Sequence, residues 1–256
     1  FSNNIPPPPF FFFSPPLSGG GPPARARPPR SVAIAIDLLQ GLLIACVVGW
    51  VIDLPRRLFG VAFYTEQLLA VCLGLGLALS FLTSQFPSRW IGWAGAAAAI
   101  AICGFIAIRY EVFAYEIALL PTEGIIGSAI LLLLVLEGTR RSAGGVLVVI
   151  ILAICAYVFI GPHMPGDFAT RPVSVARLVV YLGLDGNGVI GNILAVAVLI
   201  VIPFTLMGQV LGRTGGAAWF ADLAMSAMGT FRGGAAKIAV VGSALFGMIS
   251  GAAVSN

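Results

Sequence analysis

Charged side chains are scarce in this sequence, and their scarcity restricts the class of protein. Asp, Glu, Lys and Arg make up 9% of the 256 residues, whereas they make up roughly 25% of a soluble domain. Hydrophobic residues make up 59%, and the mean hydropathy is +1.03. This composition excludes an ordinary soluble domain and indicates an integral membrane protein. The net charge of +4 comes from basic residues between apolar runs, which set orientation in a bilayer, so we exclude nucleic acid as a partner.

Residues that commonly serve catalysis or bind structural metals are also scarce. His163 is the only histidine, and it lies in a predicted loop. The sequence has no G-x-S-x-G, no H-E-x-x-H and no P-loop motif. The four cysteines each stand alone in an apolar segment, without a C-x-x-C pair: Cys46, Cys72, Cys103 and Cys155. We therefore predict that the protein is not an enzyme and has no cofactor.

Both ends of the sequence favour a piece of a longer chain. Residue 1 is Phe, and residue 256 falls inside an apolar segment that has no closing loop. The first 30 residues are rich in Pro and Gly and show neither helical nor strand periodicity. We expect residues 1–31 to form a disordered tail.

Long apolar runs are what the sequence does contain. A helix that spans a bilayer needs about 20 mainly apolar residues. Six stretches reach or approach that length: residues 32–54, 67–82, 90–108, 121–136, 145–160 and 189–207. A seventh run, residues 238–250, is too short and too rich in small residues to span. The predicted fold class is therefore all-α, a polytopic helical membrane protein.

The basic residues predict the orientation of these spans. With the N-terminus in the cytoplasm, nine Lys and Arg residues lie inside and five lie outside. Because basic residues are enriched on the cytoplasmic side, this bias favours an N-terminus inside, although Arg56 and Arg57 oppose it. The "EGTRR" loop then faces the cytoplasm, and the "RYEVFAYE" and "GPHMPGD" loops face the periplasm.

Two connecting segments are amphipathic and too short to span. In "PVSVARLVVYL", which starts at Pro172, apolar residues recur at helical spacing beside Arg177. In "AAWFADLAMSAMGTF", an apolar face lies opposite Asp222, Ser226 and Thr230. That face consists of Phe220, Leu223, Ala224, Ala227 and Phe231. Such helices lie in the plane of the lipid headgroups. We expect them to be in-plane arm helices, either as a framework around a binding part or only as braces for the loops.

Polar and small residues inside the spans allow more than one interpretation. Asp37 is only about 10 Å along a helix from Arg30, so it can reach the membrane interface, where it has an interfacial or helix-packing role. The alternative is an ion-relay carboxylate within the span. In "GLGLALS", which begins at Gly74, close helix packing explains the glycines better than phosphate binding does.

The sequence ends in "SALFGMISGAAVSN", where a helix is expected to break about halfway across the membrane. Such a break exposes backbone groups that lipid cannot satisfy, so it must face protein or a watery cavity. Free carbonyls at a helix C-terminus suit a cation, and Ser255 and Asn256 are favoured N-cap types for a second half-helix. Secondary transporters build ion and substrate sites in this way. The alternative is an unbroken helix with a small-residue interface.

The second half of the sequence, over most of residues 121–256, resembles a known family. The stretch from "GRTGGAAWFADLAMSAMGTF" to "GMISGAAVSN" resembles the early part of the large membrane subunit of tripartite ATP-independent periplasmic (TRAP) transporters. "LLVLEGTRRSAGG" and "FIGPHMPGDFATR" are similar to fused TRAP permeases, in which the small and large subunits form one chain. The family usually has S-G-S-A-V-A-N at the tip, whereas Ala252 here replaces a hydroxyl residue and Ser255 adds one.

The resemblance implies the fold, the function and the site. It implies small-subunit-like scaffold and linking helices over residues 32–165 and the start of a transport region over 166–256. It also implies a re-entrant helical hairpin and an elevator motion. The implied function is sodium-driven import of small organic acid anions across the bacterial inner membrane, with delivery by a periplasmic binding protein. The binding residues would be Ser250, Gly251, Ala253, Ser255 and Asn256, with Ser250 and Asn256 as sodium ligands.

Two other classes stay open at this stage. A structural or assembly subunit of the membrane would need no broken helix. A membrane-embedded enzyme would need reactive residues outside this sequence.

Overall fold

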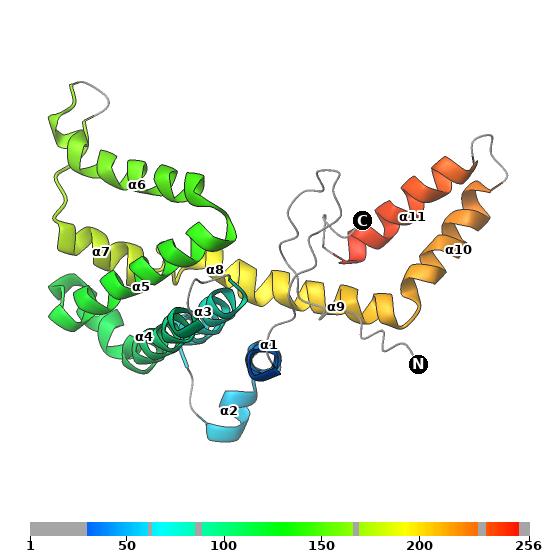
Figure 1. The fold of residues 1–256 in the computed structure, drawn as a ribbon, viewed down its shortest axis with the longest axis horizontal. Coiled ribbons are helices and arrows are strands. Elements are labelled where there is room, and N and C mark those ends of the chain that lie inside the picture. The colour runs from blue at the N-terminus through cyan, green and yellow to red at the C-terminus, as the bar shows by residue number, and fades with distance from the viewer. Residues whose placement is uncertain (1–29, 61–62, 85–88, 166–168, 230–233, 251–256) are drawn as a thin grey trace. The chain divides into compact units, whose positions relative to one another are not determined.

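The computed structural model describes residues 30–60, 63–84, 89–165, 169–229 and 234–250, and every regular element in these ranges is a helix (Figure 1). Within these ranges, six helices are long and apolar enough to cross a membrane: Ser31–Val51, Thr65–Thr83, Trp90–Glu116, Thr122–Ser142, Gly145–His163 and Asn192–Arg213. The predicted all-α, polytopic class and its six spans are confirmed. The described residues up to Val198 form one compact unit, and those from Leu199 onward form another.

The first unit is built around a helical hairpin. Helix α3 (Thr65–Thr83) packs along α4 (Arg89–Glu116) and also contacts α1 (Arg30–Val51). Their shared core is apolar: Leu77, Ala78 and Phe81 of α3 lie against Ala96 and Ala99 of α4. Alanine on one side and large side chains on the other allow the two helices to approach closely.

Gly74 permits the closest approach between α3 and α4. A Cβ atom at Gly74 would lie 2.7 Å from Cβ of Cys103 and 3.3 Å from the Ala99 carbonyl oxygen. Real Cβ atoms do not come this close, so α4 occupies the space that a side chain at residue 74 would need. The helix-packing interpretation of "GLGLALS" is confirmed at Gly74 but not at Gly76, where no atom lies within 4 Å of a Cβ.

Two helices end at residues other than the predicted ones, because the end of an apolar run does not always coincide with the end of a helix. The predicted first span, residues 32–54, ends earlier, because Asp53 adopts a left-handed conformation (φ 57°) and starts the short helix α2 (Leu54–Phe59). The predicted third span ended at residue 108, whereas α4 continues to Glu116. Its last turns carry Arg109 and Glu111, which are tolerated because a helix can continue beyond the hydrocarbon core.

Helices α5 (Thr122–Ser142) and α7 (Val175–Leu184) pack on each other through small residues. The η1 turn (Ile117–Leu119) lies in the connection between α4 and α5. Ser174 caps α7, because its hydroxyl accepts a hydrogen bond from the Arg177 amide (3.3 Å). Helix α6 (Gly145–Ile160) packs on α5 but has no buried residue. An apolar helix that is exposed on most sides suits contact with lipid.

The sixth span is continuous but irregular. It starts as α8 (Asn192–Val196), passes through the π-helical turn η4 (Ala197–Val201) and continues as α9 (Ile202–Arg213). The predicted start at residue 189 is too early, because residues 185–191 form a tight loop that is closed by the hydrogen bond from the Asn192 amide to the Gly186 carbonyl (2.9 Å).

The chain continues into α10 (Gly216–Met228) and α11 (Gly234–Ser250), which pack against each other and against α9. Both segments that we predicted as arm helices are helical, as α7 and α10. Their position in the membrane plane stays a prediction. The predicted division into residues 1–31, 32–165 and 166–256 also stays a prediction. It assigns segments to the small or the large subunit, whereas the two compact units of the structure are defined by contacts within the chain. The first of these segments lies almost wholly outside the described residues.

Candidate functional site

The predicted ion and substrate site begins at the last residue of helix α11 and continues into the residues that follow it in the chain. Ser250 is the last residue of α11, and its backbone is helical. Gly251, Ala253, Ser255 and Asn256 lie outside the described residues. The structure therefore describes the helix that leads to the predicted tip but not the tip, and the assignment of sodium ligands to Ser250 and Asn256 stays a prediction.

Helix α11 is positioned by a close contact with α10. The two helices lie side by side in Figure 1. Ala224 of α10 is fully buried, and a Cβ atom at Gly242 of α11 would lie 3.6 Å from the Ala224 Cβ. Phe220, one turn earlier on α10, is 8% exposed. Small residues on both helices thus form a hairpin whose second arm carries Ser250.

The predicted apolar face of α10 is only partly the packed face. Phe220 and Ala224 are buried, as expected for residues four positions apart on one side of a helix. Leu223 is 41% exposed and Ala227 is also exposed, so these two residues lie outside the contact with α9 and α11. The contact face is narrower because small residues let the helices meet along a single line.

The π turn in the sixth span was not predicted from the sequence. Pro203 lacks an amide proton and stands in the first turn of α9, so the regular hydrogen-bond ladder cannot continue through it. The Thr205 hydroxyl donates a hydrogen bond to the Val201 carbonyl at 2.7 Å, next to the change in winding. The signal for this feature was present, since Pro203 interrupts the run "LIVIPFT". Proline and π turns both mark irregular places in membrane helices.

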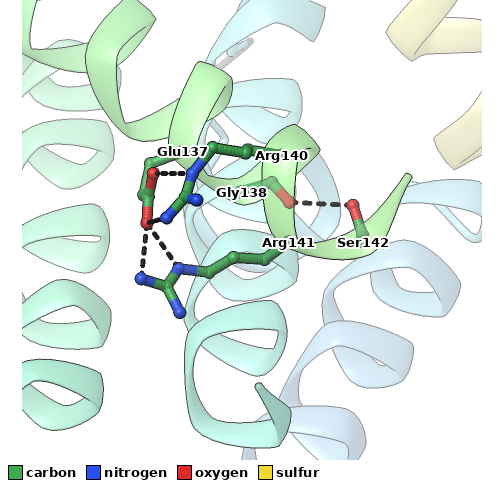
Figure 2. A network of polar contacts seen from close by, with 5 residues as sticks. All are labelled: Glu137, Gly138, Arg140, Arg141 and Ser142. Carbon is green, nitrogen blue, oxygen red and sulfur yellow. Dashed lines mark hydrogen bonds and ion pairs between the residues drawn. The ribbon is translucent and has the colours of Figure 1, made fainter. Parts of the chain in front are cut away.

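A charged cluster closes the end of α5 that we predict to be cytoplasmic. The Glu137 carboxylate accepts hydrogen bonds from Nε of Arg140 (2.8 Å) and Nε of Arg141 (2.6 Å), as Figure 2 shows. The Ser142 hydroxyl donates to the Gly138 carbonyl at 2.8 Å. These residues belong to the motif "LEGTRRS". One carboxylate between two guanidinium groups leaves a net positive charge at a helix C-terminus, where cations are favoured.

The opposite ends of α4 and α5 are joined by one ion pair. Arg109 of α4 and Glu123 of α5 approach to 2.9 Å, and both side chains are largely exposed. Deeper in the first unit, the Gln67 side chain accepts from the Tyr64 amide and donates to the Ala107 carbonyl, each at 2.9 Å. These polar contacts lie at or near the ends of spans, as expected for helices that cross a bilayer.

The remaining candidate groups lie apart from one another. His163 is exposed in the η2 turn (Gly161–His163), and Asp37 is exposed on α1. Across the ranges that the structure describes, no three His, Cys, Asp or Glu side chains gather as possible ligands of a metal ion. The four cysteines are free thiols. The two interpretations of Asp37 stay open.

Part of the chain matches a known protein family. Residues 130–256 match the family described as tripartite ATP-independent periplasmic transporter, DctM component. The matched segment begins inside α5 and covers α6 to α11, just under half of the chain. Neither the curated proteins nor the solved structures contain a match to the chain.

Proposed function

We propose that the protein imports small organic acids across the bacterial inner membrane, driven by a sodium gradient. The support is the match of residues 130–256 to the DctM component family of the tripartite ATP-independent periplasmic transporters. The family is one of secondary transporters and not of enzymes. Its members work with a periplasmic binding protein and a small membrane component. The family match is the observation that carries this proposal.

The proposed division of labour follows the order of the helices. We assign the helices α1 to α4 to the role of the small component, because they precede the matched segment and form a helical hairpin with α1 beside it. Helices α10 and α11 form the hairpin that leads towards the proposed site. Sodium suits that place because carbonyl groups at the C-terminal end of a half-helix carry partial negative charge.

The binding protein delivers the organic acid on the periplasmic side in this proposal. The substrate then moves with an elevator motion, in which the part that contains α11 slides against the scaffold helices. The sodium ion is a coupling ion rather than a resident cofactor. Ser250, Gly251, Ala253, Ser255 and Asn256 would supply backbone and side-chain oxygen or amide groups to the ion and the acid.

Transport in reconstituted vesicles tests the proposal. The protein, with its partner components, is placed in liposomes, and the uptake of radiolabelled small carboxylic acids is measured with and without an inward sodium gradient. We expect uptake only when both the gradient and the periplasmic binding protein are present. Uptake that is equal with a potassium gradient, or that needs no binding protein, would contradict the sodium coupling or the delivery step.

A further inference from the structure

A cavity of about 280 Å³ lies between the η1 turn and helix α7, within the first compact unit. Its lining consists of two residues at η1 and four on or next to α7: Ile117, Leu120, Arg177, Val180, Tyr181 and Asp185. The lining is apolar except for one cationic and one anionic side chain and the tyrosine hydroxyl. None of these six residues belongs to the proposed transport site.

The η1 turn forms one wall of the cavity, and one side of helix α7 forms the other. Leu120 adopts a left-handed conformation (φ 52°) that ends the η1 turn. On the other wall, Arg177, Tyr181 and Asp185 are spaced four residues apart, which places them along one side of α7. Helix α7 is held in place because Gly183 lies against Ser128 of α5.

The two charges of the cavity are not neutralised by each other. None of the ion pairs among the described residues involves Arg177. Oδ1 of Asp185 accepts hydrogen bonds from the amide nitrogen of Asn187 (2.9 Å) and from its Nδ2 (3.1 Å). No donor to Oδ2 of Asp185 is found in the described part of the chain. Asp185 is the C-cap residue of α7, and its Cα lies eight residues after that of Arg177, about 12 Å further along the helix axis.

Aromatic residues place this cavity at a membrane surface. Tyr64 and Tyr110 pack with their ring centres 6.0 Å apart, and Tyr115 lies one turn further along α4, next to η1. At the other end of α4, Trp90 is 84% exposed. Tyr and Trp concentrate at the two membrane–water interfaces, so the tyrosine end of α4 marks the headgroup level. The cavity follows α4 directly in the chain and lies at that level.

We propose that this cavity binds the headgroup of phosphatidylethanolamine, a zwitterionic phospholipid. The Arg177 guanidinium pairs with the phosphate, since guanidinium groups suit phosphate oxygens. The Asp185 carboxylate accepts hydrogen bonds from the primary ammonium group. Ile117, Leu120 and Val180 contact the glycerol and the first part of an acyl chain. This binding site is additional to transport and does not depend on the sodium site.

The charge pattern favours this lipid over other common phospholipids. An anionic lipid such as phosphatidylglycerol satisfies Arg177 but leaves the Asp185 carboxylate without a cation. Phosphatidylcholine has a quaternary ammonium group, which cannot donate a hydrogen bond to Asp185. Only a primary ammonium beside a phosphate provides a partner for both side chains.

Lipid binding to the purified protein tests the proposal. Native mass spectrometry in detergent measures the fraction of protein that retains phosphatidylethanolamine, phosphatidylcholine or phosphatidylglycerol during titration with each. We expect phosphatidylethanolamine to bind about three to ten times more tightly than the other two, as for a charge-assisted contact at a partly exposed site. The soluble headgroup glycerophosphoethanolamine should bind much more weakly. If it binds as tightly as the lipid, the ligand is a soluble phosphate compound and the proposal is wrong.

Two conservative variants separate the contributions of the two charges. Asp185→Asn keeps an oxygen for the Asn187 contacts and should abolish the preference for phosphatidylethanolamine over phosphatidylcholine. Arg177→Gln should weaken all three lipids by about three- to tenfold. Arg171→Gln and Glu111→Gln remove exposed charges that do not line the cavity, and they should change nothing. Equal binding of the three lipids to the unmodified protein, or an unchanged preference in both cavity variants, would overturn the proposal. A thermal midpoint measured without lipid identifies a variant that fails to fold, and the other variant then decides.

Discussion

Gly183 of α7 lies directly against Ser128 of α5, and a Cβ atom at residue 183 would be only 2.6 Å from the Ser128 Cβ. Ser128 is fully buried, so its side chain has little room to move away. This contact fixes the position of α7, which supplies one wall of the lipid cavity. It also shows why a glycine is needed at this point of the amphipathic helix α7.

Gly183→Ala should therefore destabilise the protein. Overpacking of a close contact typically costs about 1–3 kcal/mol, because the two helices must separate. The thermal midpoint in detergent should fall, whereas Gly186→Ala should leave it nearly unchanged, since no atom lies within 4 Å of a Cβ there. Ser128→Gly combined with Gly183→Ala should restore part of the loss. Equal midpoints for the two alanine variants would show that α5 and α7 do not pack in this way.

Ser128→Ala should be neutral or stabilising. The Ser128 hydroxyl is buried and has no hydrogen-bond partner among the described residues. A buried polar group without a partner costs about 1–3 kcal/mol, and alanine removes that group while keeping the Cβ atom. The thermal midpoint, measured beside that of Ser142→Ala on the exposed end of α5, checks this. A clear loss of stability in Ser128→Ala alone would mean that the hydroxyl has a partner in the membrane.

Gln67→Leu should weaken the contact between α3 and α4. It removes the hydrogen bond to the Ala107 carbonyl and the one from the Tyr64 amide. Hydrogen bonds between membrane helices contribute about 0.6 kcal/mol on average, so we expect a small but measurable fall in thermal midpoint. Gln40→Leu on α1 is a matched control, because no hydrogen bond of the Gln40 side chain is found among the described residues. A larger effect for Gln40→Leu would contradict the assignment.

Much of this fold could be predicted from apolar length, and the exceptions have physical causes. All six spans were predicted, and the bounds predicted for the fifth agree with α6 (Gly145–Ile160). Hydropathy could not predict that α4 continues to Glu116, because a helix does not end where the hydrocarbon does. The left-handed conformation of Asp53 was not predicted, although a signal was present: aspartate tolerates this conformation better than most residues do, and Pro55, Arg56 and Arg57 follow it.

The candidate sites differ in how much the sequence could reveal. The spacing of Arg177, Tyr181 and Asp185 is visible in the sequence, but Ile117 and Leu120 come from a turn almost 60 residues earlier. Only tertiary packing brings the two groups together. At the predicted sodium site only the sequence supplies candidate residues, because four of the five proposed residues lie outside the ranges that the structure describes.

The orientation of the spans can be tested by labelling single cysteines. In a background in which the four native cysteines are replaced by alanine, we introduce Ser142→Cys and His163→Cys, both at exposed positions. The basic residues predict residue 142 in the cytoplasm and residue 163 in the periplasm. A membrane-impermeant maleimide applied to whole cells should label residue 163 only, and labelling of both should follow cell lysis. Labelling of residue 142 alone in intact cells would mean that the orientation is inverted. Gly166, another position in this periplasmic loop, lies outside the described residues.

The tip that follows α11 should control the sodium dependence of transport. Asn256→Ala removes a side chain that we expect both to cap a half-helix and to face sodium. Loss of a cap costs about 1 kcal/mol, and loss of a hydrogen bond to a charged group costs about 1.5–3 kcal/mol. The half-saturating sodium concentration should therefore rise about tenfold or more. Ser250→Ala should shift it in the same direction, whereas Ser142→Ala and Cys155→Ala should not.

Uptake measured across a sodium titration, normalised to the amount of folded protein in the membrane, distinguishes a ligand from a packing residue. If Asn256 only packs between helices, expression and the thermal midpoint fall while the sodium midpoint stays the same. Ser255→Ala is a useful third variant, because the related family has alanine at this place and a sodium site built from backbone carbonyls would tolerate it. A sodium midpoint that is unchanged in both Ser250→Ala and Asn256→Ala would remove the ion site from this tip, because neither the end of α11 nor the cap of the next helix would then sense the ion.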